Sequence, residues 1–210
     1  MFGVFDVPVA GAYHVVLGIA GAMNPALAIV LFTIMVRLAL HPLARAAARG
    51  ERRRAELAPK IRALQEKYGK NRERLARELA ALQREEGASM FAGCLPMLVQ
   101  LPFFFVMYRL FSATTVAGEP NGLLARTIFG SPLGMHAAVT PVFAVLVVAL
   151  AVVAWWSTRL TKAEVPALVR VLPYGSVLAA LVIPLAAGIY LLATTAWATA
   201  ERAYLRSVYR

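Results

Sequence analysis

Apolar positions along this chain gather into four long runs, at residues 25–43, 94–111, 140–157 and 165–197. A membrane-spanning helix needs about 20 mostly apolar residues to cross the hydrocarbon core of a bilayer, which is about 30 Å thick. The last run is too long for one such helix, and Pro184 lies near its middle. We therefore expect it to form two helices joined by a tight turn. The five predicted spans are residues 24–43, 89–112, 140–158, 165–183 and 184–199.

The polar segment at residues 44–88 has a different pattern. Its apolar residues recur every three or four positions, which is typical of amphipathic helices. They are Leu57, Ile61, Leu64, Tyr68, Leu75, Leu79 and Leu82. We expect Pro59 near the start of the first helix, where its missing N–H would be unpaired anyway, and a turn at residues 69–71. Gly87 is expected to end the second helix, so the segment is predicted to be a helical hairpin.

The remaining segments are predicted to connect or flank the spans. Residues 1–23 are apolar, but Asp6, Pro8 and His14 interrupt them, which favours a helix lying along the membrane surface. No Lys or Arg precedes Arg37, so a cleavable signal peptide is not expected and Met1 is expected to remain in the mature protein. The other connecting segments are an outer loop at 113–139, a short loop at 159–164 and a tail at 200–210.

Composition and charge indicate a membrane protein and its orientation. Hydrophobic residues make up 60% of the chain and its mean hydropathy is +0.66, whereas soluble domains have about 45–50% apolar residues. Residues 44–88 hold 13 of the 22 Lys and Arg residues, but residues 113–139 hold only Arg126. Short cytoplasmic loops carry the excess of positive charge. The hairpin and the C-terminus are therefore expected inside the cell and the N-terminus outside.

Arg37 is the principal candidate functional residue, because it lies in an otherwise uncharged span. A cation at membrane depth costs about 2.5–3.5 kcal/mol on insertion scales. The side chain could extend to the lipid headgroups, but with Arg45 at the interface the Arg37 backbone would lie about 12 Å deep. We therefore expect it to face a water-accessible cavity. No Asp or Glu lies inside a predicted span, so Arg37 is expected to be unpaired and available to an acidic ligand.

The spans and their ends contain other polar and aromatic residues. Arg109 lies near the outer end of its span and is expected to extend to the headgroups. Gln100 lies mid-span, where its amide either ties helices together or lines a cavity. Trp155 and Trp156 fall at a cytoplasmic helix end, which is typical of interfacial anchoring. Cys94, the single cysteine, excludes an intramolecular disulfide and is expected to be an unreactive buried thiol.

Catalytic chemistry has no candidate residues in this sequence. The chain lacks a Gly-rich phosphate loop, a zinc motif and a nucleophile elbow, and the predicted spans lack paired carboxylates. Its histidines, His14, His41 and His136, have no metal-binding spacing. We therefore expect a protein that is not an enzyme and uses neither a metal nor a cofactor.

Several short motifs, in their order along the chain, resemble one family. A span with an arginine in its inner third precedes the charged hairpin, which is followed by proline-containing and glycine-containing motifs. The quoted motifs are Leu57-Ala58-Pro59-Lys60-Ile61, Gln65-Glu66-Lys67-Tyr68, Gly93-Cys94-Leu95-Pro96, Gln100-Leu101-Pro102-Phe103-Phe104, Phe129-Gly130, Pro132-Leu133-Gly134, Pro184 and Gly188-Ile189-Tyr190. Together they resemble the YidC-type membrane protein insertase family over residues 25–204.

The resemblance implies an all-α membrane protein with five transmembrane helices around a hydrophilic groove that opens to the cytoplasm and the lipid. Arg37 matches the family's groove arginine and Gln100 a polar groove position, whereas Tyr108, Trp155 and Trp156 align less securely as groove or substrate-contact positions. Nascent membrane proteins and the lipid bilayer are the implied partners. The ribosome and the Sec translocon are further candidates, and no specific nucleic-acid sequence is expected.

The sequence also departs from the fuller family pattern. No large extracytoplasmic domain precedes the first matched span, and the tail is short. Both features suggest a short form of the family in a bacterial inner membrane, and the tail argues against strong tail-mediated ribosome binding. Two other classes stay open on the sequence alone. One is a membrane assembly chaperone without insertase activity, and the other is a small anion transporter or channel, which would usually show an internal repeat.

Overall fold

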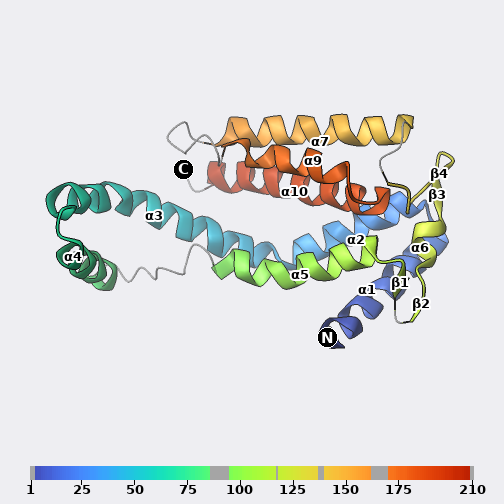
Figure 1. The fold of residues 1–210 in the computed structure, drawn as a ribbon, viewed down its shortest axis with the longest axis horizontal. Coiled ribbons are helices and arrows are strands. Elements are labelled where there is room, and N and C mark those ends of the chain that lie inside the picture. The colour runs from blue at the N-terminus through green and yellow to red at the C-terminus, as the bar shows by residue number, and fades with distance from the viewer. Residues whose placement is uncertain (1–2, 86–94, 117, 137–139, 162–169, 209–210) are drawn as a thin grey trace. The chain divides into compact units, whose positions relative to one another are not determined.

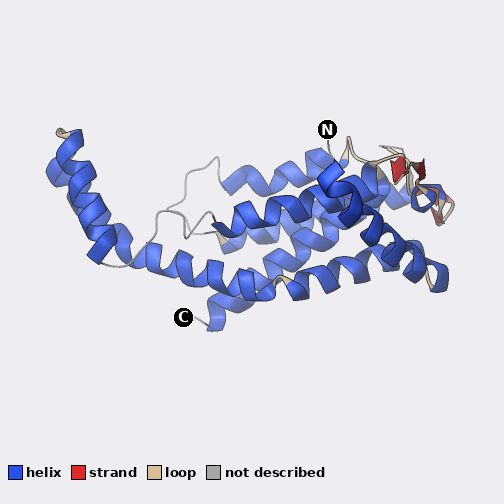
Figure 2. Ribbon diagram, turned by 90° about the horizontal axis from the view of Figure 1, so that it is seen from below, coloured by secondary structure: helices blue, strands red, loops and turns tan. Residues whose placement is uncertain are grey.

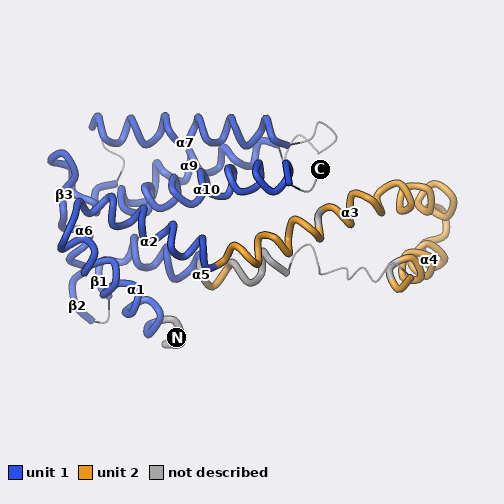
Figure 3. Tube along the Cα trace, turned by 180° about the vertical axis from the view of Figure 1, so that it is seen from behind, with its two compact units in different colours: residues 1–39, 103–210 blue, residues 40–102 orange. Residues whose placement is uncertain are grey.

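The computed structural model describes residues 3–85, 95–116, 118–136, 140–161 and 170–208. The described chain is predominantly helical (Figures 1 and 2), as the sequence predicts. It divides into two compact units (Figure 3). The first comprises Met1–Ala39 and Phe103–Arg210, and the second comprises Leu40–Pro102.

Helices that lie side by side form the first unit (Figure 1). Helix α10 packs against both α2 and α7, while α1 packs against α2, and η1 and α9 pack against α7. The elements are α1 (Gly3–Ala22), α2 (Pro25–Ala39), the C-terminal part of α5 (Leu95–Ser112), α7 (Pro141–Leu160), η1 (Leu172–Tyr174), α9 (Gly175–Ala180) and α10 (Leu185–Val208).

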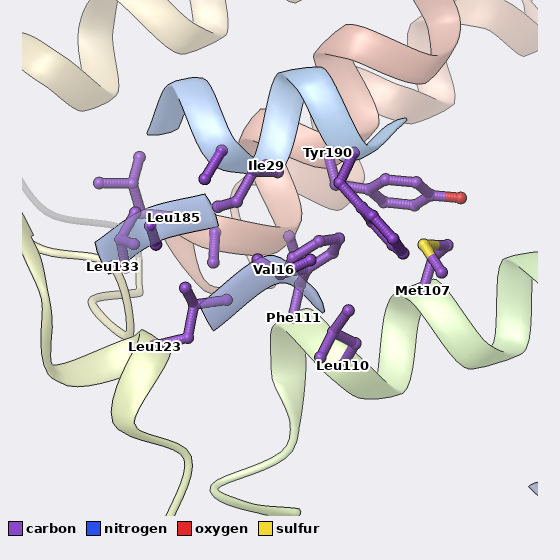
Figure 4. Packing of buried hydrophobic residues seen from close by; sticks show 14 of the residues in the cluster. Val16, Ile29, Met107, Leu110, Phe111, Leu123, Leu133, Leu185 and Tyr190 are labelled. Atoms are coloured by element: carbon purple, nitrogen blue, oxygen red, sulfur yellow. The ribbon is translucent and has the colours of Figure 1, made fainter. Parts of the chain in front are cut away.

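The core of this unit draws on segments far apart in the sequence (Figure 4). Val16 of α1, Ile29 of α2, Phe111 of α5 and Leu185 of α10 are almost completely buried and belong to one hydrophobic cluster. Burying a side chain of this size stabilises the fold by about 1.5–3 kcal/mol. Residues from the apolar runs therefore pack inside the protein.

Helices α7 and α10 approach closely because of one glycine. A Cβ atom added at Gly188 of α10 would lie 2.6 Å from Cδ2 of Leu146, which is buried on α7. A side chain at this position would require Leu146 to move. At the other end of α10, Arg206 donates a hydrogen bond to the carbonyl of Leu160, one of the last residues of α7. The two helices are therefore joined by packing and by a helix-end contact.

The loop between α5 and α7 contains short strands that the all-helical prediction missed. Each of the two hairpins turns through a glycine with positive φ, Gly118 or Gly130, which is the conformation that such turns require. The elements are β1 (Thr115–Val116), β2 (Glu119–Pro120), α6 (Gly122–Ala125), β3 (Thr127–Ile128) and β4 (Ser131–Pro132).

This loop also closes one end of the helical unit. The amides of Leu185 and Ala186, at the start of α10, donate to the carbonyls of Met135 and Leu133 at 2.8 and 2.9 Å. Early helix amides have no partner within the helix, so the loop satisfies them. The side chain of buried Asn121 donates to two carbonyls at the end of α5 and accepts from an amide of α6.

The second unit contains helices α3 (His41–Tyr68) and α4 (Arg72–Glu85), which pack against each other. The predicted turn at residues 69–71 is confirmed. All seven apolar positions that predicted these helices are buried or half-buried. Across the turn, the guanidinium of Arg74 lies 5.0 Å from the ring centre of Tyr68, a cation–π contact.

The first helix of the hairpin begins earlier than expected. Pro59 was expected near a helix start, but it lies inside α3, because that helix begins already at His41. The continuous helix reflects the alanines and arginines that follow His41, which are good helix formers. The predicted stop at Gly87 lies outside the described residues.

The helix boundaries refine the predicted spans. Within the first predicted span the helix is interrupted, because α2 ends at Ala39 and α3 begins at His41. The turn near Pro184 is confirmed, and α10 then continues to Val208, through most of the predicted tail. Among the described residues, α7 is the one helix long and apolar enough to cross a membrane, or one of two if α2 and α3 are counted as a single bent span. The number of spans stays a prediction.

Candidate functional site

Arg37 forms a specific hydrogen-bonded contact with α10. Its Nε donates to Oγ1 of Thr194 at 2.8 Å, and its Nη2 donates to the same oxygen. Thr194 is only 6% exposed, and Arg37 is half-buried. The expectation that Arg37 has no partner is therefore wrong. The partner is a neutral hydroxyl that the sequence separates from Arg37 by 157 positions, so no local pattern links the two.

Helix geometry also changes the predicted depth of Arg37. The estimate of about 12 Å assumed one straight helix from Arg37 to Arg45. The helix is instead interrupted at Leu40, so Arg37 lies in the last turn of α2. A cation there interacts favourably with the partial negative charge of the helix C-terminus. The local backbone therefore contributes to holding the guanidinium, and the depth estimate does not apply.

Other polar side chains of α10 act on the same place. Tyr190, which is 5% exposed, and Glu201 lie on the same helix as Thr194, within electrostatic reach of Arg37. Tyr190, Thr194 and Glu201 are spaced by four and seven residues, which places them on one face of the helix. We call Arg37, Tyr190 and Thr194 the arginine cluster.

An aromatic row connects α5 to the arginine cluster. The ring of Tyr190 lies 5.5 Å from that of Phe111 and 6.4 Å from that of Phe104, measured between centres. Phe104 stacks on Tyr108 at 6.1 Å with the ring planes 13° apart. Figure 4 shows Tyr190 beside residues of α5. The structure thus connects Tyr108, a predicted site residue that is 43% exposed, to Arg37 through intervening side chains.

Trp155 and Trp156 lie on α7, away from its buried face. That face is formed by residues spaced three or four apart, ending at Ala154, whereas the two tryptophans are 51% and 40% exposed. The guanidinium of Arg159 lies 4.9 Å from the ring centre of Trp155. Exposed rings suit interfacial anchoring as well as substrate contact, so their assignment to the site stays a prediction.

Gln100 lies in α5, within the second unit, and its side chain is outside the described part of the structure. Its proposed place in the site therefore also stays a prediction. Cys94 lies outside the described residues too.

Arg109 contacts a carboxylate that the sequence did not predict, while its expected contact with lipid headgroups stays a prediction. Its Nη2 lies 3.4 Å from Oδ1 of Asp6, so the ion pair joins α5 to α1. Both side chains are partly exposed, and such pairs typically contribute about 0–1 kcal/mol. Sequence reasoning missed this partner because Asp6 lies outside the predicted spans. Thr194 and Tyr190 could have been found by their four-residue spacing within an apolar run.

The apolar composition of the chain and a helix long and apolar enough to span a bilayer indicate the class of membrane proteins. Comparison with known proteins then assigns the chain more narrowly. It belongs to the family described as 60Kd inner membrane protein, which matches residues 17–210.

Similar proteins include three that bear the name membrane protein insertase YidC. The protein of Mycobacterium leprae (strain TN) is 41% identical over 113 residues, covering 52% of this chain and 30% of the relative. That of Acidiphilium cryptum (strain JF-5) is 39% identical over 102 residues, covering 49% and 17%. That of Mycolicibacterium paratuberculosis (strain ATCC BAA-968 / K-10) is 49% identical over 77 residues, covering 35% and 22%. The chain therefore matches less than a third of the length of each.

Proposed function

We propose that this chain is a membrane protein insertase that moves short polar segments of nascent membrane proteins across the bilayer without nucleotide hydrolysis. Family membership and the name shared by its relatives support the insertase class. The observation that carries the mechanism is the contact of Arg37 with Thr194, because it holds a cation between two helices with a partner that leaves its charge uncancelled.

The proposed architecture has five transmembrane helices around a hydrophilic groove, with the hairpin of α3 and α4 on the cytoplasmic side. Arg37 and Gln100 would line the groove, and Tyr108, Trp155 and Trp156 would contact the substrate. The exposed ion pair of Arg52 with Glu56 and the basic residues of the hairpin suit a solvated segment. The ribosome and the Sec translocon are candidate partners at the entrance of the groove.

Arg37 would act as a transient binding site for acidic side chains. A guanidinium carries five N–H donors in a rigid fork that matches a carboxylate. Thr194 receives two of these hydrogen bonds, so the other donors can bind the oxygens of an incoming Asp or Glu. The attraction between opposite charges is stronger in a partly buried site than in bulk water. The bound segment would therefore cross a shorter apolar barrier.

Release would follow from the hydrophobic helix of the substrate. Burying apolar surface in lipid stabilises the substrate helix by about 25 cal/mol per Å². Summed over a whole helix, this free energy exceeds that of a single weak ionic contact. The substrate would leave the arginine as its helix enters the membrane. No chemical energy source is needed for such a sequence of steps.

Purified protein in liposomes tests this function. We expect Arg37→Ala to slow insertion of a single-span substrate with an acidic tail, and Arg37→Glu to slow it further by repulsion. Arg45→Ala is the matched control, since Arg45 is exposed in the first turn of α3. Insertion at the wild-type rate by correctly folded Arg37 variants would refute the role of Arg37.

The same preparation separates the other classes. An assembly chaperone would stabilise substrate helices already in the membrane without speeding their entry. An anion transporter would show solute flux in the absence of any polypeptide substrate. An insertase would show accelerated entry and no flux.

A further inference from the structure

The tip of the β3–β4 hairpin carries a residue that neither the fold nor the arginine cluster explains. Phe129 is 94% exposed and has a φ of 46°. It is the one non-glycine residue with positive φ in the described part of the chain. Exposed apolar residues are common, so the exposure alone says little. A bulky aromatic residue in this backbone region is unusual and costs conformational energy.

The hairpin geometry explains why the conformation is required. Thr127 pairs with Pro132 and Ile128 with Ser131, so Phe129 and Gly130 form a two-residue turn. Both have positive φ, the arrangement for which Asn-Gly is the preferred pair. Phenylalanine is therefore a poor choice for the turn itself. In the described structure its ring is almost fully solvent-exposed, so no packing contact of the ring offsets the conformational energy of this backbone.

The base of the hairpin is rigidly anchored. Ile128, Ser131 and Leu133 are buried, and the amide of Leu133 donates to the carbonyl of Arg126 at 2.8 Å. The guanidinium of Arg126 in turn donates to the carbonyl of Ala20, at the end of α1. An exposed ring on a fixed support is held in one place, as a contact residue needs to be.

The chain places this ring close to the membrane boundary. The carbonyls of Leu133 and Met135 receive hydrogen bonds from the first amides of α10, and Thr140 caps the start of α7. Figure 1 shows β3 and β4 at the end of the first unit where α7 begins. Helix α7 is the described helix with the length and composition of a membrane span. The hairpin tip therefore lies at the level where α7 would enter the bilayer.

We propose that Phe129 inserts into the interfacial region of the lipid bilayer on the side of the membrane where α7 begins, and so anchors the loop that caps α10. Aromatic rings are enriched at this level of membrane proteins, and residues 127–135 carry no charge that would oppose insertion. Lipid would supply the contact that the described protein does not. This proposal rests on α7 spanning the membrane but not on insertase activity.

A photoreactive phenylalanine derivative, p-benzoylphenylalanine, tests the contact at position 129. The full-length protein would be reconstituted in vesicles of phosphatidylethanolamine and phosphatidylglycerol, irradiated and analysed by mass spectrometry. The matched control carries the derivative at Glu119, which is exposed on the β1–β2 hairpin of the same loop. We expect at least tenfold more lipid adduct from position 129. Equal lipid labelling at both positions would overturn the proposal.

A second measurement guards against an unreactive photoprobe. In a Cys94→Ser background, Phe129→Cys and Glu119→Cys would be labelled with an environment-sensitive fluorophore in the same vesicles. The label at 129 should be shielded from aqueous iodide and quenched by spin-labelled lipid, and the label at 119 should show the reverse. Iodide access at 129 equal to that at 119 would refute lipid insertion. Shielding in native membranes but not in vesicles would point to a protein partner and would also overturn it. Neither experiment includes an insertion substrate, so its outcome is independent of the proposed function.

Discussion

At the scale of single residues, the partner of Arg37 matters because it is neutral. A carboxylate partner would cancel the charge of the guanidinium and compete with any acidic ligand. The hydroxyl of Thr194 accepts hydrogen bonds from the guanidinium and fixes its position, but the guanidinium keeps its positive charge. The arginine cluster is therefore suited to attracting acidic groups repeatedly without retaining them.

Replacing Thr194 tests this positioning role. Thr194→Val keeps the shape of the side chain but removes the acceptor for Arg37. Losing a hydrogen bond to a charged group costs about 1.5 kcal/mol or more, so we expect about a tenfold fall in the rate for acidic-tailed substrates. Thr194→Ser should restore the rate, and a neutral-tailed substrate should be affected less. Equal losses for Val and Ser, or for both substrates, would indicate a purely structural role.

Replacing Glu201 provides a second test, in which the insertion rate should change in the opposite direction. Its carboxylate lies within electrostatic reach of Arg37 and should reduce the attraction that an acidic segment experiences. Glu201→Gln should therefore speed insertion of acidic-tailed substrates, by about two- to fivefold, because charges interact weakly through a partly hydrated region. Glu119→Gln, a substitution of an exposed carboxylate in the α5–α7 loop, is the control. Slower insertion by Glu201→Gln would show that this carboxylate supports Arg37 and does not compete with the substrate.

At the scale of elements, the contact of α7 with α10 depends on Gly188. A side chain there would displace buried Leu146, and overpacking of a core typically costs about 1–3 kcal/mol. We expect Gly188→Val to lower the free energy of unfolding in detergent by about this amount. Gly11→Ala is the control, because Gly11 lies in helix α1 with open space around it and should be neutral or stabilising.

A double substitution isolates this contact. Leu146→Ala alone should cost about 2–5 kcal/mol through the cavity it leaves. Combined with Gly188→Val, the new side chain would fill part of that space, so the two effects should sum to less than their separate values. Strict additivity would mean that Gly188 and Leu146 are not in contact.

Helical elements were largely predictable from the sequence, and their partners were not. The spacing from Leu57 to Leu82 predicted α3 and α4, and Pro184 correctly placed the turn before α10. The end of α2 at Ala39 was not predicted, because the residues up to Leu43 are still apolar and mark no boundary. The contacts of Arg37 with Thr194 and of Arg109 with Asp6 join distant segments, which periodicity cannot reveal.

At the scale of the whole molecule, α9 decides the number of spans. It has six residues, Gly175–Ala180, and η1 precedes it directly. Together they are shorter than the roughly 20 residues of a spanning helix, and residues 162–169 upstream lie outside the described structure. Either this region completes a fourth span, giving five in total, or it enters and leaves the membrane on one side. With five spans, the C-terminus and the loop after α5 lie on opposite sides of the membrane. With four spans, they lie on the same side.

Cysteine labelling from each side of the membrane distinguishes these topologies. In a Cys94→Ser background, Lys70→Cys, Glu119→Cys and Ser207→Cys introduce exposed thiols in the hairpin, the α5–α7 loop and the end of α10. Because the hairpin holds most of the positive charge, we expect Lys70→Cys to react only from the cytoplasmic side and Glu119→Cys only from outside. With three spans between residues 119 and 207, Ser207→Cys should react from the cytoplasm. Reaction of Ser207→Cys from outside, together with Glu119→Cys, would refute the five-span topology. It would also conflict with the contact of Arg206 with Leu160, which places the end of α10 at the end of α7.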